Sequence, residues 1–418
     1  MLDDGTENVL TDSASYSLGE DDSNTDGAIF SKADLTINGS GTLTVNANYK
    51  HGIVSKDDLV ITDGNINVTS ASTAMEGKDS VKISGGTFNI SAGTNGIKST
   101  NAEASDKGFI SVTGGSFTVV ANNDAFEAET VLSIEGGSFD VTTGGGSANA
   151  SMKSDGSPNR NWQNNMGNGG GGPNGMGRPD DNRNGTGGDP PAMPTADNTG
   201  LTIEATANTT TDSDSTSTSA KALKAGNEVN ISGGEFKIDS ADDSVHSNGN
   251  IVIAGGNISV ASGDNGMHAN GNLTISDGTV DITKSYEGIE GSIVTIDGGT
   301  ISVVASDDGI NCAGGSDTGS TDRMGADQFS SQDGVELNIN GGTVTIDADG
   351  DGLDSNGNFT IAGGTVYVCG PTNGGNGALD YNGTATVTGG TLIACGAVGM
   401  EEGFGDSSTQ YSVLHDLG

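Results

Sequence analysis

Acidic side chains recur at one position of a repeating sequence in this 418-residue chain. There a carboxylate is followed by a second acid or Asn, a small residue, an apolar residue and then another potential ligand. Calcium prefers carboxylate and amide oxygens and takes about 6–8 of them. The candidate ligands, which we call the acidic corner, are Asp124, Glu127, Asp242, Asp243, Asp264, Glu287, Glu290, Asp307, Asp308, Asn311, Asp349, Asp351, Asp354 and Asp380.

The acidic corner is predicted to bind calcium because its carboxylates should otherwise repel one another. Stacking of the repeats would bring equivalent acids within roughly 5–10 Å, and carboxylates that close raise one another's pKa. Few lysines or arginines stand in these stretches to offset the charge. A solvated acidic edge is the alternative interpretation, but recurrence at one phase of the repeat favours a metal.

Two other metal motifs can be weighed from their spacing. The stretch Asp347-Ala-Asp349-Gly-Asp351-Gly352 matches the start of an EF-hand loop, but the twelfth position is Asn358 rather than Glu. Strand patterns flank it, so a helix–loop–helix is not expected. His246 and His268 occupy equivalent places in neighbouring repeats and could bind a transition metal. An outward-facing histidine ladder beside the acidic corner is the favoured interpretation.

The repeat that positions the acidic corner is clearest in two adjacent copies, at 229–250 and 251–272. Each copy carries three short apolar alternations bounded by Gly and Asn, which predicts strands rather than helices. Repeats of this length cannot bury an apolar face alone, so they are expected to stack. The sequence therefore predicts an all-β solenoid, a parallel β-helix of about twelve coils of ~22 residues with three short strands per coil. The expected inward columns include Ile231, Ile253, Ile275, Ile296, Ile339 and Ile361.

Interruptions of the repeat predict the organisation of the chain. Residues 1–34 should form an atypical first coil or cap, and 35–141 regular coils. The Gly/Asn/Pro-rich stretch 142–200, which holds Trp162, has no periodicity and is expected to be a mobile insertion. Coils should resume over 201–409, interrupted by a second insertion near 314–332, before a C-terminal tail at 410–418.

The charge balance limits the partners. Lys and Arg number 16 against 56 Asp and Glu, which gives a net charge of −40. Such a chain repels nucleic acids and anionic membranes and attracts cations. No apolar run approaches the ~20 residues that span a bilayer, and the first residues lack the pattern of a signal peptide.

The three cysteines do not suggest a disulfide scaffold. Cys369 and Cys395 stand at matching places one repeat apart, so they are either a pair joined across neighbouring coils or two stacked thiols. Cys312 stands alone.

The segments DDSVHSNGN, DDGIN and DGDGLDSNGN, together with ISGGTF-type strands, resemble the carbohydrate-binding β-helix proteins of plant-cell-wall-degrading bacteria. The resemblance implies a secreted or surface-displayed, right-handed parallel β-helix. It also implies binding of calcium and of acidic polymers such as polygalacturonate or pectin, with cellulose as a further ligand. Asp307-Asp308-x-x-Asn311 and Asp351-x-x-Asp354 look like the calcium motif of β-helical pectate lyases. Asn311 departs from that motif, as do the histidines that end the Asp242 and Asp264 coils.

Three functions remain open, of which non-catalytic binding of a plant cell-wall polysaccharide is favoured. The first alternative is a calcium-dependent pectate lyase that cleaves polygalacturonate by β-elimination, which needs a nearby Lys or Arg as base. Lys284 is the basic residue closest in sequence to an acidic corner in the C-terminal half, and Lys98 and Lys224 lie in less acidic coils. The second alternative is a structural adhesin rod on the cell surface.

Overall fold

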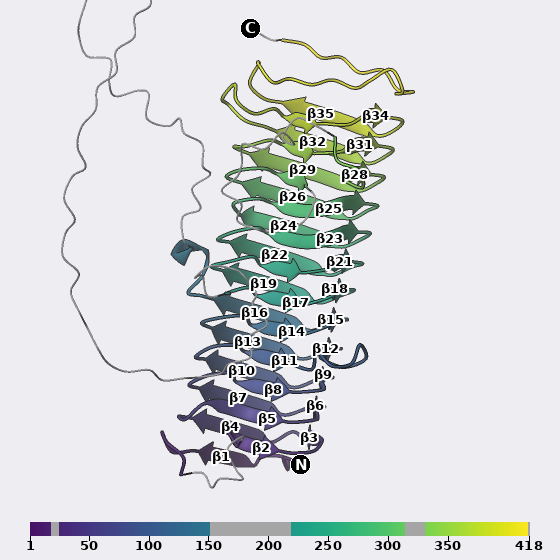
Figure 1. Ribbon diagram of the computed structural model, residues 1–418. Coiled ribbons are helices and arrows are strands. Elements are labelled where there is room, and N and C mark those ends of the chain that lie inside the picture. The colour runs from purple at the N-terminus through teal and green to yellow at the C-terminus, as the bar shows by residue number, and fades with distance from the viewer. Residues whose placement is uncertain (18–24, 151–218, 314–330, 417–418) are drawn as a thin grey trace, which may run out of the picture. The chain divides into compact units, whose positions relative to one another are not determined.

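The computed structural model describes residues 1–17, 25–150, 219–313 and 331–416. In Figure 1 the strands stack coil above coil, from β1 near the N-terminus to β35 near the C-terminal tail. Neighbouring strands pair in parallel, each with the equivalent strand of the next coil. The predicted all-β parallel β-helix is confirmed.

Each coil contributes three strands, which form three columns along the solenoid. The first column is a sheet of thirteen strands, against the roughly twelve coils expected. Its members are β1 (Glu7–Thr11), β4 (Thr42–Ala47), β7 (Asn65–Ser70), β10 (Thr87–Ala92), β13 (Ser116–Ala121), β16 (Ser138–Thr143), β19 (Glu235–Ser240), β22 (Asn257–Ser262), β24 (Thr279–Lys284), β26 (Thr300–Ala305), β29 (Thr343–Ala348), β32 (Thr365–Cys369) and β35 (Thr391–Cys395).

The second column follows the acidic corner and consists mostly of short strands. Its members are β2 (Gly27–Ser31), β5 (His51–Ser55), β8 (Met75–Gly77), β11 (Ile97–Ser99), β14 (Phe126–Ala128), β17 (Leu223–Ala225), β20 (Val245–Ser247), β23 (Met267–Ile275), β25 (Ile289–Ile296), β27 (Ile310–Cys312), β30 (Leu353–Ser355) and β33 (Leu379–Tyr381).

The third column precedes the Gly-Gly turns. Its members are β3 (Leu35–Ile37), β6 (Asp58–Ile61), β9 (Ser80–Ile83), β12 (Phe109–Val112), β15 (Val131–Ile134), β18 (Glu228–Ile231), β21 (Asn250–Ile253), β28 (Glu336–Ile339), β31 (Asn358–Ile361) and β34 (Ala385–Val387). β23 and β25 continue from the second column into the third without a break, so these two columns form one sheet.

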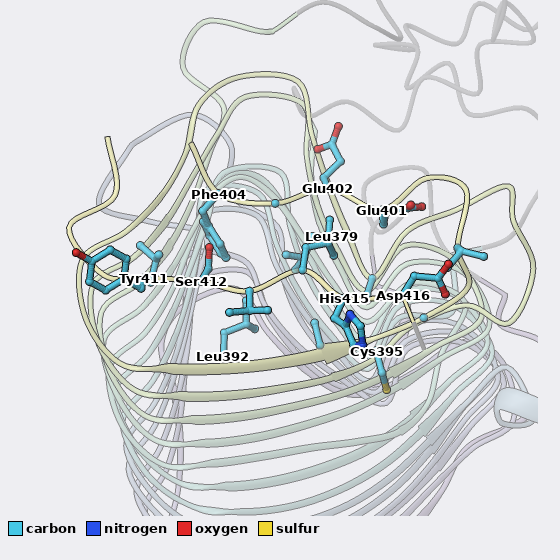
Figure 2. A pocket seen from close by; sticks show the side chains of 18 of the residues that line it. Leu379, Leu392, Cys395, Glu401, Glu402, Phe404, Tyr411, Ser412, His415 and Asp416 are labelled. Atoms are coloured by element: carbon cyan, nitrogen blue, oxygen red, sulfur yellow. The ribbon is translucent and has the colours of Figure 1, made fainter. Parts of the chain in front are cut away.

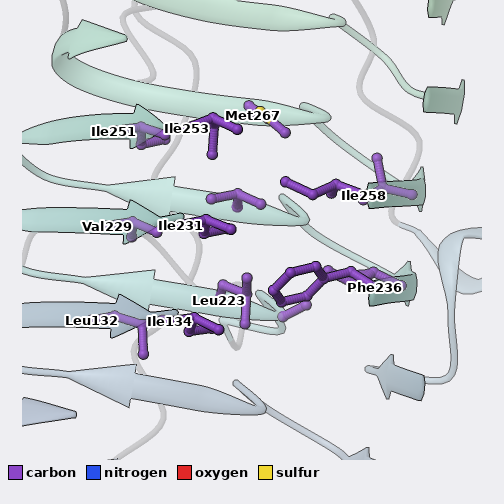
Figure 3. Close-up of a cluster of buried hydrophobic side chains, with 14 of the residues drawn as sticks. Leu132, Ile134, Leu223, Val229, Ile231, Phe236, Ile251, Ile253, Ile258 and Met267 are labelled. Atoms are coloured by element: carbon purple, nitrogen blue, oxygen red, sulfur yellow. The ribbon is translucent and has the colours of Figure 1, made fainter. Parts of the chain in front are cut away.

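The core is a set of apolar columns inside the coils. The predicted isoleucine column is confirmed: Ile231, Ile253 and Ile275 stand in register and are almost fully buried, and Figure 3 shows the first two among neighbouring core side chains. Burying one such side chain contributes about 1.5–3 kcal/mol. A second column holds four stacked rings, with centroids 4.5–4.8 Å apart, from Phe88, Phe117, Phe139 and Phe236.

The Gly-Gly turns need glycine for two different reasons. The first glycine lies against the coil below: a Cβ on Gly341 would stand 2.2 Å from the carbonyl oxygen of Asp297. The second adopts a left-handed conformation, with φ of +78° at Gly342, where a side chain costs about 1–2 kcal/mol. The second glycine is kept in every one of these turns, whereas Asp63 and Asp277 take the first position in two coils and accept the N–H of the glycine that follows.

Gly342→Ala is expected to destabilise the protein more than Gly334→Ala. Gly334 has a similar φ of +85°, but a Cβ there meets no atom within 4 Å, whereas one on Gly342 would stand 2.8 Å from the Gly299 carbonyl oxygen. Gly334→Ala should cost about 1–2 kcal/mol, and Gly342→Ala that amount plus the displacement of a neighbouring coil. Chemical denaturation measures both, and equal losses would contradict the close stacking.

Several predicted segments fall partly or wholly outside the described residues. They include most of the insertion 142–200 with Trp162, the start of the 201–409 coils, and most of the insertion at 314–332. Within the described ranges the helical segment is one 3-10 turn, η2 (Ser147–Asn149). The described residues contain no helix with the length and hydropathy of a membrane span.

Candidate functional site

The acidic corner lies between the first-column strand and the second-column strand of each coil. From β8 onward an apolar residue opens the second-column strand and is buried, as at Val245, Ile289 and Leu353. The residue two places before it and the residue just after it therefore flank an inward anchor. Because equivalent strands pair in register, both flanking positions form columns with a spacing of ~4.8 Å.

We name the two columns by their place in the coil. The strand column consists of residues directly paired between neighbouring coils, in the order Glu76, Lys98, Glu127, Lys224, His246, His268, Glu290, Asn311, Asp354 and Asp380. The corner column stands three residues earlier in each coil, in the order Asn95, Asp124, Lys221, Asp243, Asn265, Glu287, Asp308 and Asp351.

Corner carboxylates are fixed by the coil that follows. One oxygen of Asp243 accepts the backbone N–H of Asn265 at 3.1 Å, and one oxygen of Asp308 accepts that of Asp351 at 2.7 Å. Asp124 accepts the N–H of Lys221 in the same way, at 2.8 Å. Each bond holds one carboxylate oxygen against the backbone, so the second oxygen is oriented for another partner.

The N-terminal half of the columns is neutralised by lysines. Lys98 lies 2.8 Å from Glu127, and Lys224 lies 3.4 Å from Asp124. Lys221 contacts Asp242 at 2.8 Å and Asp243 at 3.1 Å. The expectation that few lysines stand among the acids is wrong for this half.

The middle of the columns holds two buried histidines. His246 is 6% exposed and His268 1% exposed, so the expected outward-facing ladder is wrong. Their rings meet edge to face with centroids 4.9 Å apart. They face the carboxylate of Asp243 rather than solvent, which explains why an outward position of the pleat holds buried side chains.

The described residues of the C-terminal half provide fewer cations to the columns. Among the described residues, no lysine or arginine forms an ion pair with the candidate ligands Glu287, Glu290, Asp351, Asp354 or Asp380. Lys284 lies close by in sequence, but its ammonium group donates to the backbone carbonyl of Ser147 at 2.7 Å. The charge of the columns thus changes from compensated to strongly negative along the solenoid.

The pKa values follow this change. Burial raises the pKa of Glu287, helped by the carboxylate of Glu290, and burial likewise raises the pKa of Asp354 well above its usual range, helped by Asp308. For Asp351, burial and neighbouring acids raise the pKa to about 6.

Asp243 in the middle of the columns shows the opposite behaviour. Its burial acts to raise the pKa, but Lys221 and His246 hold it well below its usual range. Ionised carboxylates are therefore stabilised in the lysine-paired half and destabilised in the C-terminal half.

Three acids of the C-terminal half could together hold a metal ion. Oxygen atoms of Asp308, Asp351 and Asp354 lie within 4.8 Å of one another, and opposite ligands of one calcium ion, each at about 2.3–2.6 Å, lie at most about 5 Å apart. The Oδ1 of Asn311, beside Asp354 in the strand column, is buried and accepts no hydrogen bond from the described residues. An oxygen-only donor set of this kind suits a hard divalent cation.

The remaining predicted ligands are less central. Asp307 stands one residue before Asp308, close enough to raise the pKa of Asp354. Asp264 clusters with Asp242 and Asp243. Asp349 is exposed, and strands β29 and β30 flank its stretch, as the sequence indicates against an EF-hand.

A separate cavity of about 590 Å³ lies beyond the last coils. Figure 2 shows its lining, which includes Leu379, Leu392, Phe404 and Tyr411. The tail residues Val413 and Leu414 that also line it are largely exposed. Its lining is mixed, because Glu401, Glu402 and Asp416 stand beside these apolar residues. Nearby, Cys369 and Cys395 stand in register as free thiols, so the stacked-thiol alternative holds.

Comparison with known proteins gives three findings. A family model described as "Carbohydrate-binding domain-containing protein" matches residues 1–266 and 267–377. A protein of the same description from Acetivibrio thermocellus is 50% identical over 68 residues, which are 16% of this chain and 24% of that protein. A solved structure titled "polysaccharide lyase-like protein from C. thermocellum, Gadolinium derivative" is 42% identical, with 34% of this chain and 58% of the other covered and a TM-score of 0.34.

Proposed function

Because the chain belongs to the family of carbohydrate-binding domain-containing proteins, we propose that it binds an acidic plant cell-wall polysaccharide without cleaving it. Calcium ions held by the C-terminal half of the acidic columns would form the contact. The relatives are covered only in part, about a quarter of the Acetivibrio protein and 58% of the solved structure. The polymer, the cation and a secreted or cell-surface location are therefore parts of the proposal.

The observation that carries the proposal is that, within the described ranges, lysine partners occur in the first half of the columns and not in the second. In the first half each acidic pair faces lysines of a neighbouring coil. In the second half the same positions hold Glu287, Glu290, Asp351 and Asp354, and burial raises the pKa of three of these four. Buried carboxylates without lysines need another source of positive charge.

The net charge of −40 then restricts how a polysaccharide could bind. Polygalacturonate is itself a polyanion and would be repelled by the bare columns. Bound calcium would supply positive charge and coordination positions open to sugar carboxylates. Its ligands would be Glu287, Glu290, Asp308, Asn311, Asp351 and Asp354. The columns present these ligands in successive coils, which suits an extended chain. Uncharged cellulose would bind, if at all, without this bridge.

Lyase chemistry ranks behind binding as the second candidate. The described lysines near the columns already have other partners, so none of them is placed to act as the base. A lyase needs a base beside the uronate ring. Lys98, Lys221 and Lys224 face carboxylates of the N-terminal half, and Lys284 donates to Ser147. A structural rod without any ligand is the third candidate.

A binding assay separates the three. The protein should sediment with insoluble polygalacturonate in millimolar calcium, lose binding in chelator, and bind weakly after methyl-esterification of the polymer. Asp351→Asn/Asp354→Asn should weaken binding by about tenfold or more, which corresponds to about 1.4 kcal/mol. Asp140→Asn/Glu235→Gln removes two charges from exposed positions of β16 and β19 and should leave binding intact.

Three outcomes would count against the proposal. Unsaturated product, followed by its ultraviolet absorbance, would favour the lyase. Absence of binding by a folded, calcium-loaded protein would favour the rod. Equal binding in excess chelator, with the fold retained, would exclude the calcium bridge.

A further inference from the structure

The two buried histidines mark a site with different chemistry from the oxygen-only half of the columns. His246 and His268 are paired in register, and both project toward Asp243, which is fully buried. Ligand atoms of these three residues all lie within 4.8 Å of one another.

The distances suit a small tetrahedral ion. The Nδ1 of His246 lies 2.9 Å from the Oδ2 of Asp243, and the Nδ1 of His268 lies 3.8 Å from the same oxygen. Ligands at about 2.0–2.2 Å from a tetrahedral zinc ion are separated by roughly 3.3–3.5 Å. The two distances bracket this range, so small side-chain movements would complete the geometry.

The far side of each imidazole meets an acceptor. The Nε2 of His246 lies 2.9 Å from the Oδ1 of Asn248, and the Nε2 of His268 lies 3.7 Å from the Oε2 of Glu290. Histidines that ligate metals usually donate their other N–H to a carboxylate or a carbonyl oxygen. A neutral imidazole has one N–H, so His246 can donate a hydrogen bond to only one of the two oxygens that face it. If that N–H is at Nε2 and faces Asn248, a cation at Nδ1 would contact the oxygen of Asp243.

The surrounding charge also favours a cation. Asp242, Asp243 and Asp264 form one carboxylate cluster, and Lys221 is the lysine that contacts it. A divalent ion would offset the excess negative charge, with Lys221 retained by Asp242. Mixed imidazole and carboxylate ligands select zinc-like transition ions, whereas oxygen-only ligands suit calcium.

We propose that Asp243, His246 and His268 bind a zinc-class transition-metal ion at the boundary between the two halves of the columns. The solenoid would then carry two kinds of metal site, one closed among buried side chains and one facing the ligand. This inference does not depend on the proposed polysaccharide.

Metal titration of the full chain tests the site. Chelator-treated protein, kept in excess calcium to saturate the oxygen-only ligands, is titrated with Co²⁺ and Zn²⁺. We expect about one zinc ion per chain by equilibrium dialysis and elemental analysis, together with the visible absorption of Co²⁺ held by nitrogen ligands. His246→Gln and His268→Gln should abolish both signals.

Two further variants keep the result interpretable. Asn248→Ala removes only the acceptor behind His246, so it should weaken zinc binding roughly 10–100-fold even if the ligand variants fail to fold. His415→Gln, on the exposed tail, should change nothing. Undiminished zinc binding by folded His246→Gln/His268→Gln would place the ion elsewhere, and absence of zinc binding by the wild type would overturn the proposal. Polygalacturonate binding in calcium, measured on the same zinc-free samples, reports separately on the proposed function.

Discussion

In zinc-free protein, replacing Lys221 with methionine should lower the free energy of unfolding by about 3–5 kcal/mol, because it leaves a buried carboxylate without its counter-charge. Lys221 lies 3.1 Å from Asp243 and 2.8 Å from Asp242, and its own side chain is only 13% exposed. Methionine keeps most of the side-chain length, so the loss of packing is small. Urea denaturation followed by circular dichroism measures the change.

The matched control is Lys237→Met. Lys237 also pairs with an aspartate of the neighbouring coil, at 3.8 Å from Asp140, but it is 81% exposed. Exposed ion pairs are worth about 0–1 kcal/mol, so this variant should be nearly neutral. Similar losses for the two lysines would mean that burial does not set the strength of these pairs.

Without calcium, the ionised carboxylates of the C-terminal half should destabilise the fold. With calcium bound, the same carboxylates should stabilise it. Burial, with the nearby acids Asp380 and Asp307, raises the pKa of Asp351 to about 6 in the folded chain. A carboxyl group with a raised folded pKa stabilises the fold while it is protonated, and this contribution is lost as the pH rises through that pKa. For Asp351 alone the loss between about pH 4 and 7 is on the order of 2 kcal/mol after discounting for solvent screening.

The variant Asp351→Asn/Asp354→Asn isolates this effect from the other titrating groups. In chelator at pH 7 it should be more stable than the wild type, because two repelling charges are gone, and near pH 4 the difference should vanish. In calcium at pH 7 this advantage should fall by about 2.7 kcal/mol when the ion is at 100 times its Kd, because the ion stabilises the wild type. The order should invert as calcium is raised further.

Melting temperatures in four conditions, chelator or calcium at each pH, measure the pattern. Asp140→Asn/Glu235→Gln should show neither the gain nor the inversion. A double Asn variant less stable than the wild type in chelator at pH 7 would mean that these carboxylates stabilise the fold without a cation.

The period of the sequence predicts most of the fold. Alternation within 229–272 and its recurrence place the strands, the isoleucine column and the acidic corner, since each follows from a side-chain position within one coil. The glycine pairs could also be expected, although the two reasons for them become visible only when one coil lies on another.

Pairing across the long insertion is what the sequence left unresolved. Lys221 is 97 residues from Asp124, yet its backbone N–H donates to that side chain. The repeat does indicate that residues 222–225 complete the interrupted coil, so Lys224 could have been aligned with Glu127. Within a single stretch of sequence, the lysine that the next coil contributes is not apparent.

The burial of His246 and His268 differs from the sequence prediction for a related reason. Their position in the strand alternation is outward, which ordinarily means exposed. Asp243 lies buried beside them and draws both rings over the corner. A rule based on alternation holds for side chains that have no partner at the bend. Here the partner lies three residues before His246 and in the coil that precedes His268.

The hydrogen bonds that tie each corner carboxylate to the next coil also bear on how such a protein can evolve. Each coil contacts only its neighbours, so duplication of the DNA that encodes one coil would add one more set of ligands without disturbing the others. The added set would keep the same spacing along the columns, because the backbone ladder fixes it. Recombination within the gene can therefore change the length of polymer engaged, and with it the avidity, while the chemistry of each contact is inherited unchanged.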